Sequence, residues 1–181
     1  MTTFDEAFER VVGIEGKYSN NPNDSGGETM YGITAAVAKA HGYVGAMRNM
    51  PIGVAQAIYR AQYWDLLRLD DIARVSIPIA HELFDTAVNC GVGKAGTFLQ
   101  RSLNVLNRGG RDYPDLTVDG VVGPMSVDAL RRLLNARGSN GQTVMLRALN
   151  ALQGAHYVAL GEARAKDEDF EFGWFLNRVV I

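Results

Sequence analysis

The chain has 181 residues and a mass of 19.7 kDa, which is the size of one ordinary domain. Hydrophobic residues make up 47% and charged residues 21%, a composition that is typical of globular proteins and argues against disorder. The 18 basic and 20 acidic side chains leave a net charge of -2, which gives no indication of nucleic-acid binding. The single cysteine, Cys90, excludes an internal disulfide framework and a cysteine-rich zinc site.

The sequence shows neither a secretory signal peptide nor a transmembrane segment. Its first ten residues are acidic and have no apolar core, and no run approaches the roughly 18 apolar residues that a membrane span needs. We therefore expect the chain to be made in the cytosol and not to insert into a membrane. If its substrate lies outside the membrane, another protein must let it across.

Hydrophobic spacing predicts a mostly α fold. Thr3 and Glu6 match a capping box at the start of a first helix, which Glu15-Gly16 would end. Residues 16–33 are rich in turn formers, and two short strands or a long loop fit there. Further helices are expected to begin at Pro78 and to span residues 34–46, 51–64, 94–107, 126–136, 143–166 and 170–179. Thr34 and Ser126 are the predicted N-caps of two of them.

Two sequence patterns resemble a dinucleotide-binding motif and a zinc-binding motif, but their surroundings do not support either kind of site. Gly91 to Gly96 matches G-x-G-x-x-G, but a helical pattern precedes it where a dinucleotide site needs a strand, so a helix–helix turn is predicted. His81-Glu82 begins an H-E-x-x-H pattern that position 85, an aspartate, breaks, and the three histidines lack ligand spacing. We expect neither a metal site nor a cofactor.

Glu15 and the loop after it carry the strongest chemical signal. The negative pole of the first helix and nearby apolar side chains are expected to raise the pKa of Glu15, as general acid catalysis requires. Asp24 and Thr29 follow in a glycine-rich segment that can fold both toward Glu15. An acid that faces a second polar group is the arrangement that cleaves glycosidic bonds. Ordinary structural roles, with Glu15 at a helix end and Asp24 in a turn, remain open at this point.

A family resemblance narrows these alternatives. Residues 14–34, IEGKYSNNPNDSGGETMYGIT, resemble the E-G-G-Y-x-N-D-P-x-D-x-G-G-x-T-x-x-G-I-T signature of glycoside hydrolase family 108, the N-acetylmuramidases of phages and prophages. Lys17 replaces a glycine of that signature, and Asn21 replaces its usual aspartate. The resemblance continues through the segments FDTAVNCG (84–91), FLQR (98–101), VDGVVGP (118–124) and GWFLNRV (173–179).

The resemblance implies a lysozyme-like helical domain with a small β-hairpin or loop segment after the first helix. Residues 1–92 would form the catalytic half and residues 93–181 a helical peptidoglycan-binding-like half, packed as one compact unit. The enzyme would cleave the β-1,4 bond from N-acetylmuramic acid to N-acetylglucosamine. Glu15 would be the general acid, and Asp24 and Thr29 would position the water or stabilise the transition state.

Four more residues are candidates for substrate binding. Tyr18 and Tyr31 would line the sugar cleft, since aromatic faces with a polar tip suit sugars, although ordinary packing explains them equally well. Asp85 and Asn89 lie one helical turn apart and share a face, from which they would contact N-acetyl groups or brace the helix. The two tryptophans, Trp64 and Trp174, are expected in the core.

The expected partner is bacterial peptidoglycan, with no nucleic acid, and the expected state is a monomer. As an endolysin, the enzyme would accumulate in the host cytoplasm and reach the periplasm and cell wall after a holin-type protein permeabilises the membrane. Two other functions stay open: a lytic transglycosylase, which uses one acid and no second carboxylate, and a non-catalytic wall-binding or secretion-helper protein.

Overall fold

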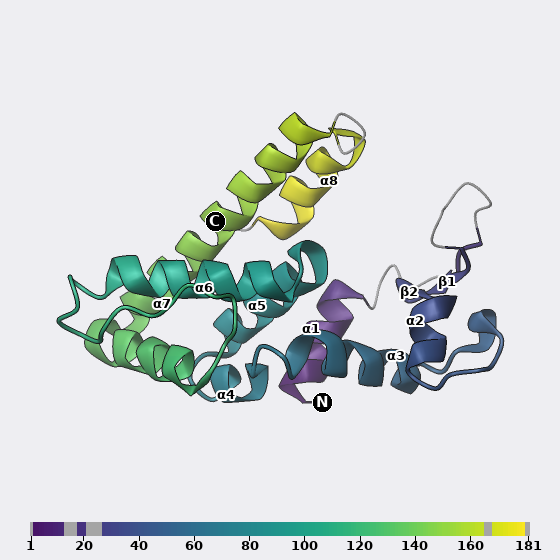
Figure 1. The fold of residues 1–181 in the computed structure, drawn as a ribbon, viewed down its shortest axis with the longest axis horizontal. Coiled ribbons are helices and arrows are strands. Elements are labelled where there is room, and N and C mark those ends of the chain that lie inside the picture. Colours follow the sequence, from purple (N-terminus) through teal and green to yellow (C-terminus); the bar gives the residue numbers. More distant parts are fainter. Residues whose placement is uncertain (1, 13–17, 21–26, 165–167, 180–181) are drawn as a thin grey trace. The chain divides into compact units, whose positions relative to one another are not determined.

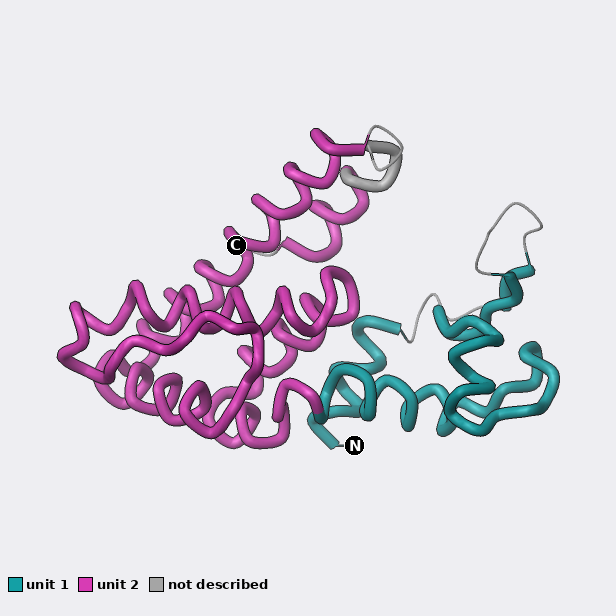
Figure 2. The backbone as a smooth tube through the Cα atoms, in the orientation of Figure 1, with its two compact units in different colours: residues 1–65 teal, residues 66–181 magenta. Residues whose placement is uncertain are grey.

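The computed structural model describes residues 2–12, 18–20, 27–164 and 168–179. This part of the chain is mostly α-helical with one small antiparallel sheet, as the sequence predicted (Figure 1). The backbone divides into two compact units, residues 1–65 and residues 66–181 (Figure 2). None of the described helices is both long and apolar enough to cross a lipid bilayer.

Unit 1, residues 1–65, begins with α1 (Thr3–Val11). The helix carries the predicted capping box, but Thr2 and Asp5 form it rather than Thr3 and Glu6: the Thr2 side chain accepts from the Asp5 N–H, and the Asp5 carboxylate accepts from the Thr2 N–H. Thr2 has the extended backbone that an N-cap requires, so the box lies one residue earlier than expected. The helix ends at Val11, with Val12 as its C-cap, and so stops short of the predicted end at Glu15-Gly16.

A hairpin follows in unit 1, as one of the two sequence alternatives proposed. Strands β1 (Thr29–Met30) and β2 (Ile33–Thr34) pair in antiparallel fashion. Tyr31 and Gly32 between them both have positive φ, 53° and 73°, as a two-residue hairpin turn requires. The hairpin leads directly into α2 (Ala35–Ala40).

Thr34 is the N-cap of α2, as predicted, and its hydroxyl accepts from the Val37 N–H at 3.3 Å. The helix ends at Ala40 rather than near Ala46. Gly42 adopts φ 85°, the left-handed backbone that commonly terminates helices, and this glycine explains the early end.

The core of unit 1 is aromatic. The chain continues through η1 (Met47–Asn49), α3 (Ile52–Tyr59) and η2 (Arg60–Trp64), a π-helical turn that replaces the end of the predicted 51–64 helix. Edge-to-face contacts join Phe4 to Trp64 at 5.3 Å and Phe8 to Tyr59 at 5.4 Å between ring centroids. Trp64 is fully buried, which confirms its predicted place in the core.

Unit 2, residues 66–181, contains the remaining helices: α4 (Leu69–Ala73), α5 (Ile77–Cys90), α6 (Val92–Leu106), α7 (Pro124–Ala163) and α8 (Glu168–Arg178). Ser76 caps α5, and Pro78 occupies its first turn. Gly91, at φ 90°, joins α5 to α6, so the predicted helix–helix turn is confirmed. Trp174 on α8 is only half-buried, unlike Trp64, and its ring lies 5.2 Å from that of Tyr157.

The sequence predicted two helices in the region of α7, and α7 does consist of two helical arms. The first arm begins at Pro124, with Gly123 as its N-cap, so Ser126 lies inside the helix and does not cap it. A break at Gly138, with φ 58° and ψ -144°, divides the helix into two arms. The predicted gap between residues 136 and 143 therefore becomes a bend at one glycine.

Amide side chains of α6 hold the connector between α6 and α7. Asn104 bonds the backbone of Leu116 with both its oxygen and its nitrogen, each at 2.8 Å. Gln100 accepts from the Gly120 N–H at 2.8 Å and donates to the Asp119 carboxylate at 2.8 Å. These hydrogen bonds hold the connector against α6, even though it has no regular secondary structure of its own.

Candidate functional site

Thr29 is the one predicted catalytic residue within the described part of the chain, and it lies at the start of β1. Its N–H donates to the Ser19 carbonyl at 2.8 Å, and its carbonyl accepts from the Ser19 N–H at 3.0 Å. This bridge brings together the two ends of the segment between residues 19 and 29. Glu15 and Asp24 lie outside the described residues, so their positions relative to Thr29 stay a prediction.

Tyr18 belongs to a polar cluster beside this bridge. Its hydroxyl donates to Glu28 Oε1 at 2.6 Å and accepts from Arg48 Nη2 at 3.5 Å. The guanidinium of Arg48 also lies 5.1 Å from the centre of the Tyr18 ring, within the range of a cation–π interaction. The half-buried Tyr18 ring is thus held by two charged neighbours from different segments of unit 1.

Tyr31 occupies the hairpin turn and is half-buried. Its carbonyl accepts from the Tyr59 hydroxyl at 3.0 Å, which ties the turn to α3. A Cβ atom at the neighbouring Gly32 would lie 2.9 Å from the same hydroxyl, so the turn packs closely on Tyr59. The structure therefore fixes the backbone of Tyr31, and contact of its ring with sugar stays a prediction.

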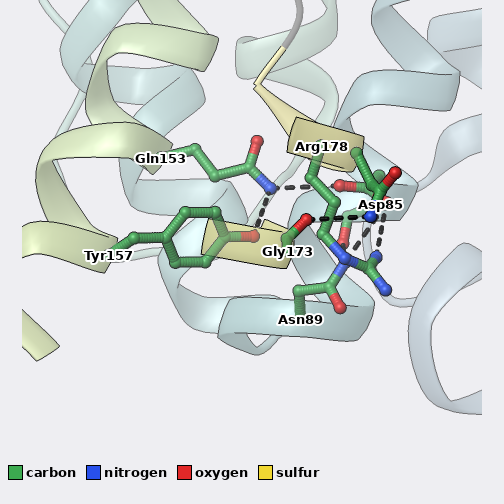
Figure 3. Close-up of polar contacts among 7 residues, drawn as sticks. Asp85, Asn89, Gln153, Tyr157, Gly173 and Arg178 are labelled. Atoms are coloured by element: carbon green, nitrogen blue, oxygen red, sulfur yellow. Dashed lines mark hydrogen bonds and ion pairs between the residues drawn. The ribbon is translucent and has the colours of Figure 1, made fainter. Parts of the chain in front are cut away.

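Asp85 and Asn89 lie in unit 2, where they share one face of α5 as predicted (Figure 3). Asn89 donates to the backbone carbonyl and to the Oδ1 of Asp85, at 2.8 and 3.2 Å. The other partners of Asp85 come from two more helices: Gln153 on α7 donates to Oδ2 at 3.0 Å, and Arg178 on α8 donates to Oδ1 at 3.0 Å. Asp85 thus braces three helices, and its proposed contact with substrate stays a prediction.

The electrostatics of this cluster extend to Glu82, one turn before Asp85 on α5. Burial and, to a lesser extent, the charge of Asp85 raise the pKa of Glu82 to about 7, while a hydrogen bond with Asn150 opposes the shift. Burial also raises the pKa of Asp85, against the hydrogen bonds of Gln153 and Arg178. In the sequence, Glu82 is notable only as part of the broken H-E-x-x-H motif. Its spacing of three residues from Asp85 was the signal for this carboxylate pair.

Neither the Cys90 thiol nor a metal-binding cluster adds a reactive site among the described residues. Burial raises the pKa of Cys90 to about 11, which makes its thiol a poor nucleophile near neutral pH. Within the described ranges, no cluster of three or more histidine, cysteine, aspartate or glutamate side chains has a geometry that would hold a metal ion.

Comparisons with known proteins assign both parts of the chain. Residues 8–91 match the family model for glycosyl hydrolase 108, and residues 94–179 match that for a predicted peptidoglycan domain. The solved structure of Brucella abortus SagA shares the fold: its TM-score is 0.65 at 24% sequence identity, over 95% of this chain and 87% of that one. No curated protein matches the chain in sequence. Residues 8–91 therefore form a glycosyl hydrolase 108 domain, and the chain is a glycoside hydrolase with a predicted peptidoglycan domain after its hydrolase domain.

Proposed function

We propose that this peptidoglycan hydrolase cleaves the β-1,4 bond from N-acetylmuramic acid to N-acetylglucosamine, with Glu15 as the general acid. The observation that carries the proposal is the match of residues 8–91 to a glycosyl hydrolase family across the segment that holds Glu15, Asp24 and Thr29. The peptidoglycan domain over residues 94–179 supports the choice of polymer.

In the proposed mechanism, Glu15 protonates the oxygen of the leaving sugar. Asp24 and Thr29 hold the attacking water or stabilise positive charge on the sugar ring. The position of Thr29 supports this role, because both its backbone groups bond Ser19 while no described residue bonds its hydroxyl. That hydroxyl is available to orient a water molecule from a fixed strand.

Tyr18 and Tyr31 are proposed to contact the sugar rings near this position. The two charged neighbours of Tyr18, Glu28 and Arg48, restrict its ring and so reduce the entropy lost when a sugar packs on it. The Tyr59 hydrogen bond to the hairpin turn restrains Tyr31 at its backbone. Both rings would then be positioned before the substrate binds.

The test is the nearly isosteric variant Glu15→Gln, assayed on purified sacculi. We expect hydrolysis to fall at least about a hundredfold, because general acid catalysis contributes a factor of about 10² to 10⁴. Glu9→Gln is the matched control, since Glu9 is an exposed residue of α1, and this variant should keep the wild-type rate. Wall clearing by Glu15→Gln at the wild-type rate would refute the proposed mechanism.

The released fragments distinguish the alternatives. Mass spectrometry of the products should show the mass of one added water, as hydrolysis requires. Anhydro-sugar ends would instead identify a lytic transglycosylase. Wild-type protein that binds sacculi and releases no fragments would identify a non-catalytic wall-binding protein.

We further propose that the enzyme serves a phage or prophage as an endolysin, accumulating in the host cytoplasm until a holin-type protein permeabilises the membrane. Cells that express the chain alone should then stay intact, and co-expression of a holin should lyse them. Lysis by the chain alone would contradict this role.

A further inference from the structure

A hollow in unit 2 lies beside the bend of α7. Its volume is about 460 Å³, within the range of about 300–1,000 Å³ that is usual for small-ligand pockets. It lies wholly within the segment matched by the peptidoglycan domain. We call it the kink groove, and its lining residues are Leu106, Leu133, Ala136, Arg137, Asn140, Gly141 and Val144.

The bend at Gly138 explains why a hollow exists here. Leu133, Ala136 and Arg137 come from the first arm of α7, and Asn140 and Val144 come from the second. Gly141 is buried, and a Cβ atom at this position would lie 2.8 Å from the Cβ of Arg137. The absence of a side chain at Gly141 thus lets the two arms approach closely beside the hollow.

The chemistry of the kink groove is divided between its floor and its rim. Leucine, alanine and valine side chains supply an aliphatic surface, and Arg137 and Asn140 are exposed polar groups. No described residue forms an ion pair or hydrogen bond with Arg137. Its neighbour Asp112, whose pKa the arginine helps to lower, is already bonded by Arg108. The guanidinium is therefore available to an anionic ligand.

We propose that the kink groove binds the stem peptide of peptidoglycan. Arg137 pairs with a peptide carboxylate, Asn140 bonds a peptide amide, and the aliphatic floor covers alanine methyl groups. The choice of polymer rests on the proposed function. The glycan strand fits less well, because sugar faces pack on aromatic rings and none of the described residues that line this groove is aromatic.

The test compares three variants of the full chain that each remove one exposed positive charge from α7: Arg137→Gln, Arg131→Gln and Arg132→Gln. Arg131 and Arg132 both pair with Asp128 and lie outside the kink groove. Arg132 also lines a second hollow, with Tyr113 and Met125, so it tests whether the peptide binds there instead.

The probe is the soluble tetrapeptide L-Ala-D-Glu-meso-diaminopimelate-D-Ala, titrated by calorimetry. We expect Arg137→Gln to weaken binding at least about tenfold, as the loss of one charge-assisted hydrogen bond implies, and the other two variants to stay within about twofold of wild type. A peptide with its carboxylates amidated should bind wild type as weakly as the free peptide binds Arg137→Gln.

Four results would overturn the proposal: no binding of the peptide by wild type, equal binding by Arg137→Gln, a larger loss in Arg132→Gln, or Arg137-dependent binding of peptide-free glycan chains. The tetrapeptide has no glycosidic bond, so its binding is independent of hydrolysis. Glu15→Gln should bind it like wild type, and a failure of the catalytic proposal is thereby distinguished from a failure of this one. Thermal unfolding of each variant checks that it folds.

Discussion

The polar groups around Tyr18 in unit 1 and those around Asp85 in unit 2 are assembled in different ways. The Tyr18 cluster joins a half-buried phenol to Glu28 and to Arg48, an exposed side chain. In the Asp85 cluster, three partners from α5, α7 and α8 surround one carboxylate that is 20% exposed. The first cluster is open to solvent on one side, and the second closes a helical interface.

The two clusters illustrate two different effects of charged groups that lie close together, one on activity and one on stability. An exposed pair contributes little to stability, because water solvates its members almost as well when they are apart. A desolvated carboxylate accepts hydrogen bonds from partners that water does not reach easily. Its removal therefore takes a hydrogen bond from each of these partners without replacing it. We therefore expect substitutions around Asp85 to change folding and substitutions around Tyr18 to change activity.

Asp85→Ala should give the largest effect on stability. It leaves Arg178 without its ion pair and the fully buried Gln153 without one of its two acceptors, and we expect the free energy of unfolding to fall by about 2–3 kcal/mol. Urea denaturation measures this loss. Asp128→Ala is the control, because Asp128 is half-exposed in its pairs with Arg131 and Arg132, and it should cost less than about 1 kcal/mol.

The same variant tests the alternative role of Asp85. If Asp85→Ala unfolds like wild type but loses activity on sacculi, then the residue contacts substrate and does not brace the helices. Asn89→Ala, which removes the exposed member of the cluster, should leave stability nearly unchanged.

Glu82→Gln should have an intermediate effect that depends on pH. The folded-state pKa of about 7 lies above the ordinary value of 4.5, so the folded protein holds a proton that the unfolded chain releases between these pH values. The stability contributed by Glu82 is fully present below pH 4.5 and is lost as the pH rises through 7. The neutral variant should therefore be more stable than wild type at pH 8, by an amount on the order of 2 kcal/mol, and nearly equal to it at pH 4.

Urea denaturation across this pH range measures the change for Glu82→Gln. Glu162→Gln, at an exposed position of α7, is the control and should keep the wild-type dependence on pH. An unchanged slope in Glu82→Gln would show that folding does not raise the pKa of this carboxyl.

Tyr18→Phe should have the smallest effect on stability, less than about 1 kcal/mol, since it removes one hydroxyl from an open cluster. If the ring lines the sugar cleft, its freed motion should raise the sacculus concentration needed for half-maximal rate several-fold. Tyr43→Phe also removes one hydroxyl hydrogen bond in unit 1, to the Ala46 carbonyl, and should leave that concentration unchanged. Equal kinetics for the two variants would exclude Tyr18 from substrate binding.

Local signals in the sequence predicted the features that depend on near neighbours. The Thr34 cap, the turn at Gly91 and the shared face of Asp85 and Asn89 all follow from residues within four positions of each other. The prediction placed the capping box one residue too far along the chain, because Thr2 and Thr3 each precede an acidic residue at the same spacing. Helix α4 was missed, since its five residues are too few to show a helical period.

The remaining features depend on residues far apart in the chain. Arg178 pairs with Asp85 across 93 positions, and Gln153 reaches the same carboxylate across 68. No periodicity links such residues, and only the packing of α7 and α8 on α5 brings them together. Of the proposed catalytic residues, Thr29 has its strand position from the structure, and the roles of Glu15 and Asp24 rest on the family signature.

The bend at Gly138 shows how the chirality of L-amino acids limits which residue can occupy this position. Its backbone angles, φ 58° and ψ -144°, are close to the mirror image of the extended polyproline conformation that L-residues favour. No atom lies within 4 Å of a Cβ built at this position, so only chirality, and not crowding, disfavours a side chain there. The place at which α7 turns is therefore set by the one achiral amino acid.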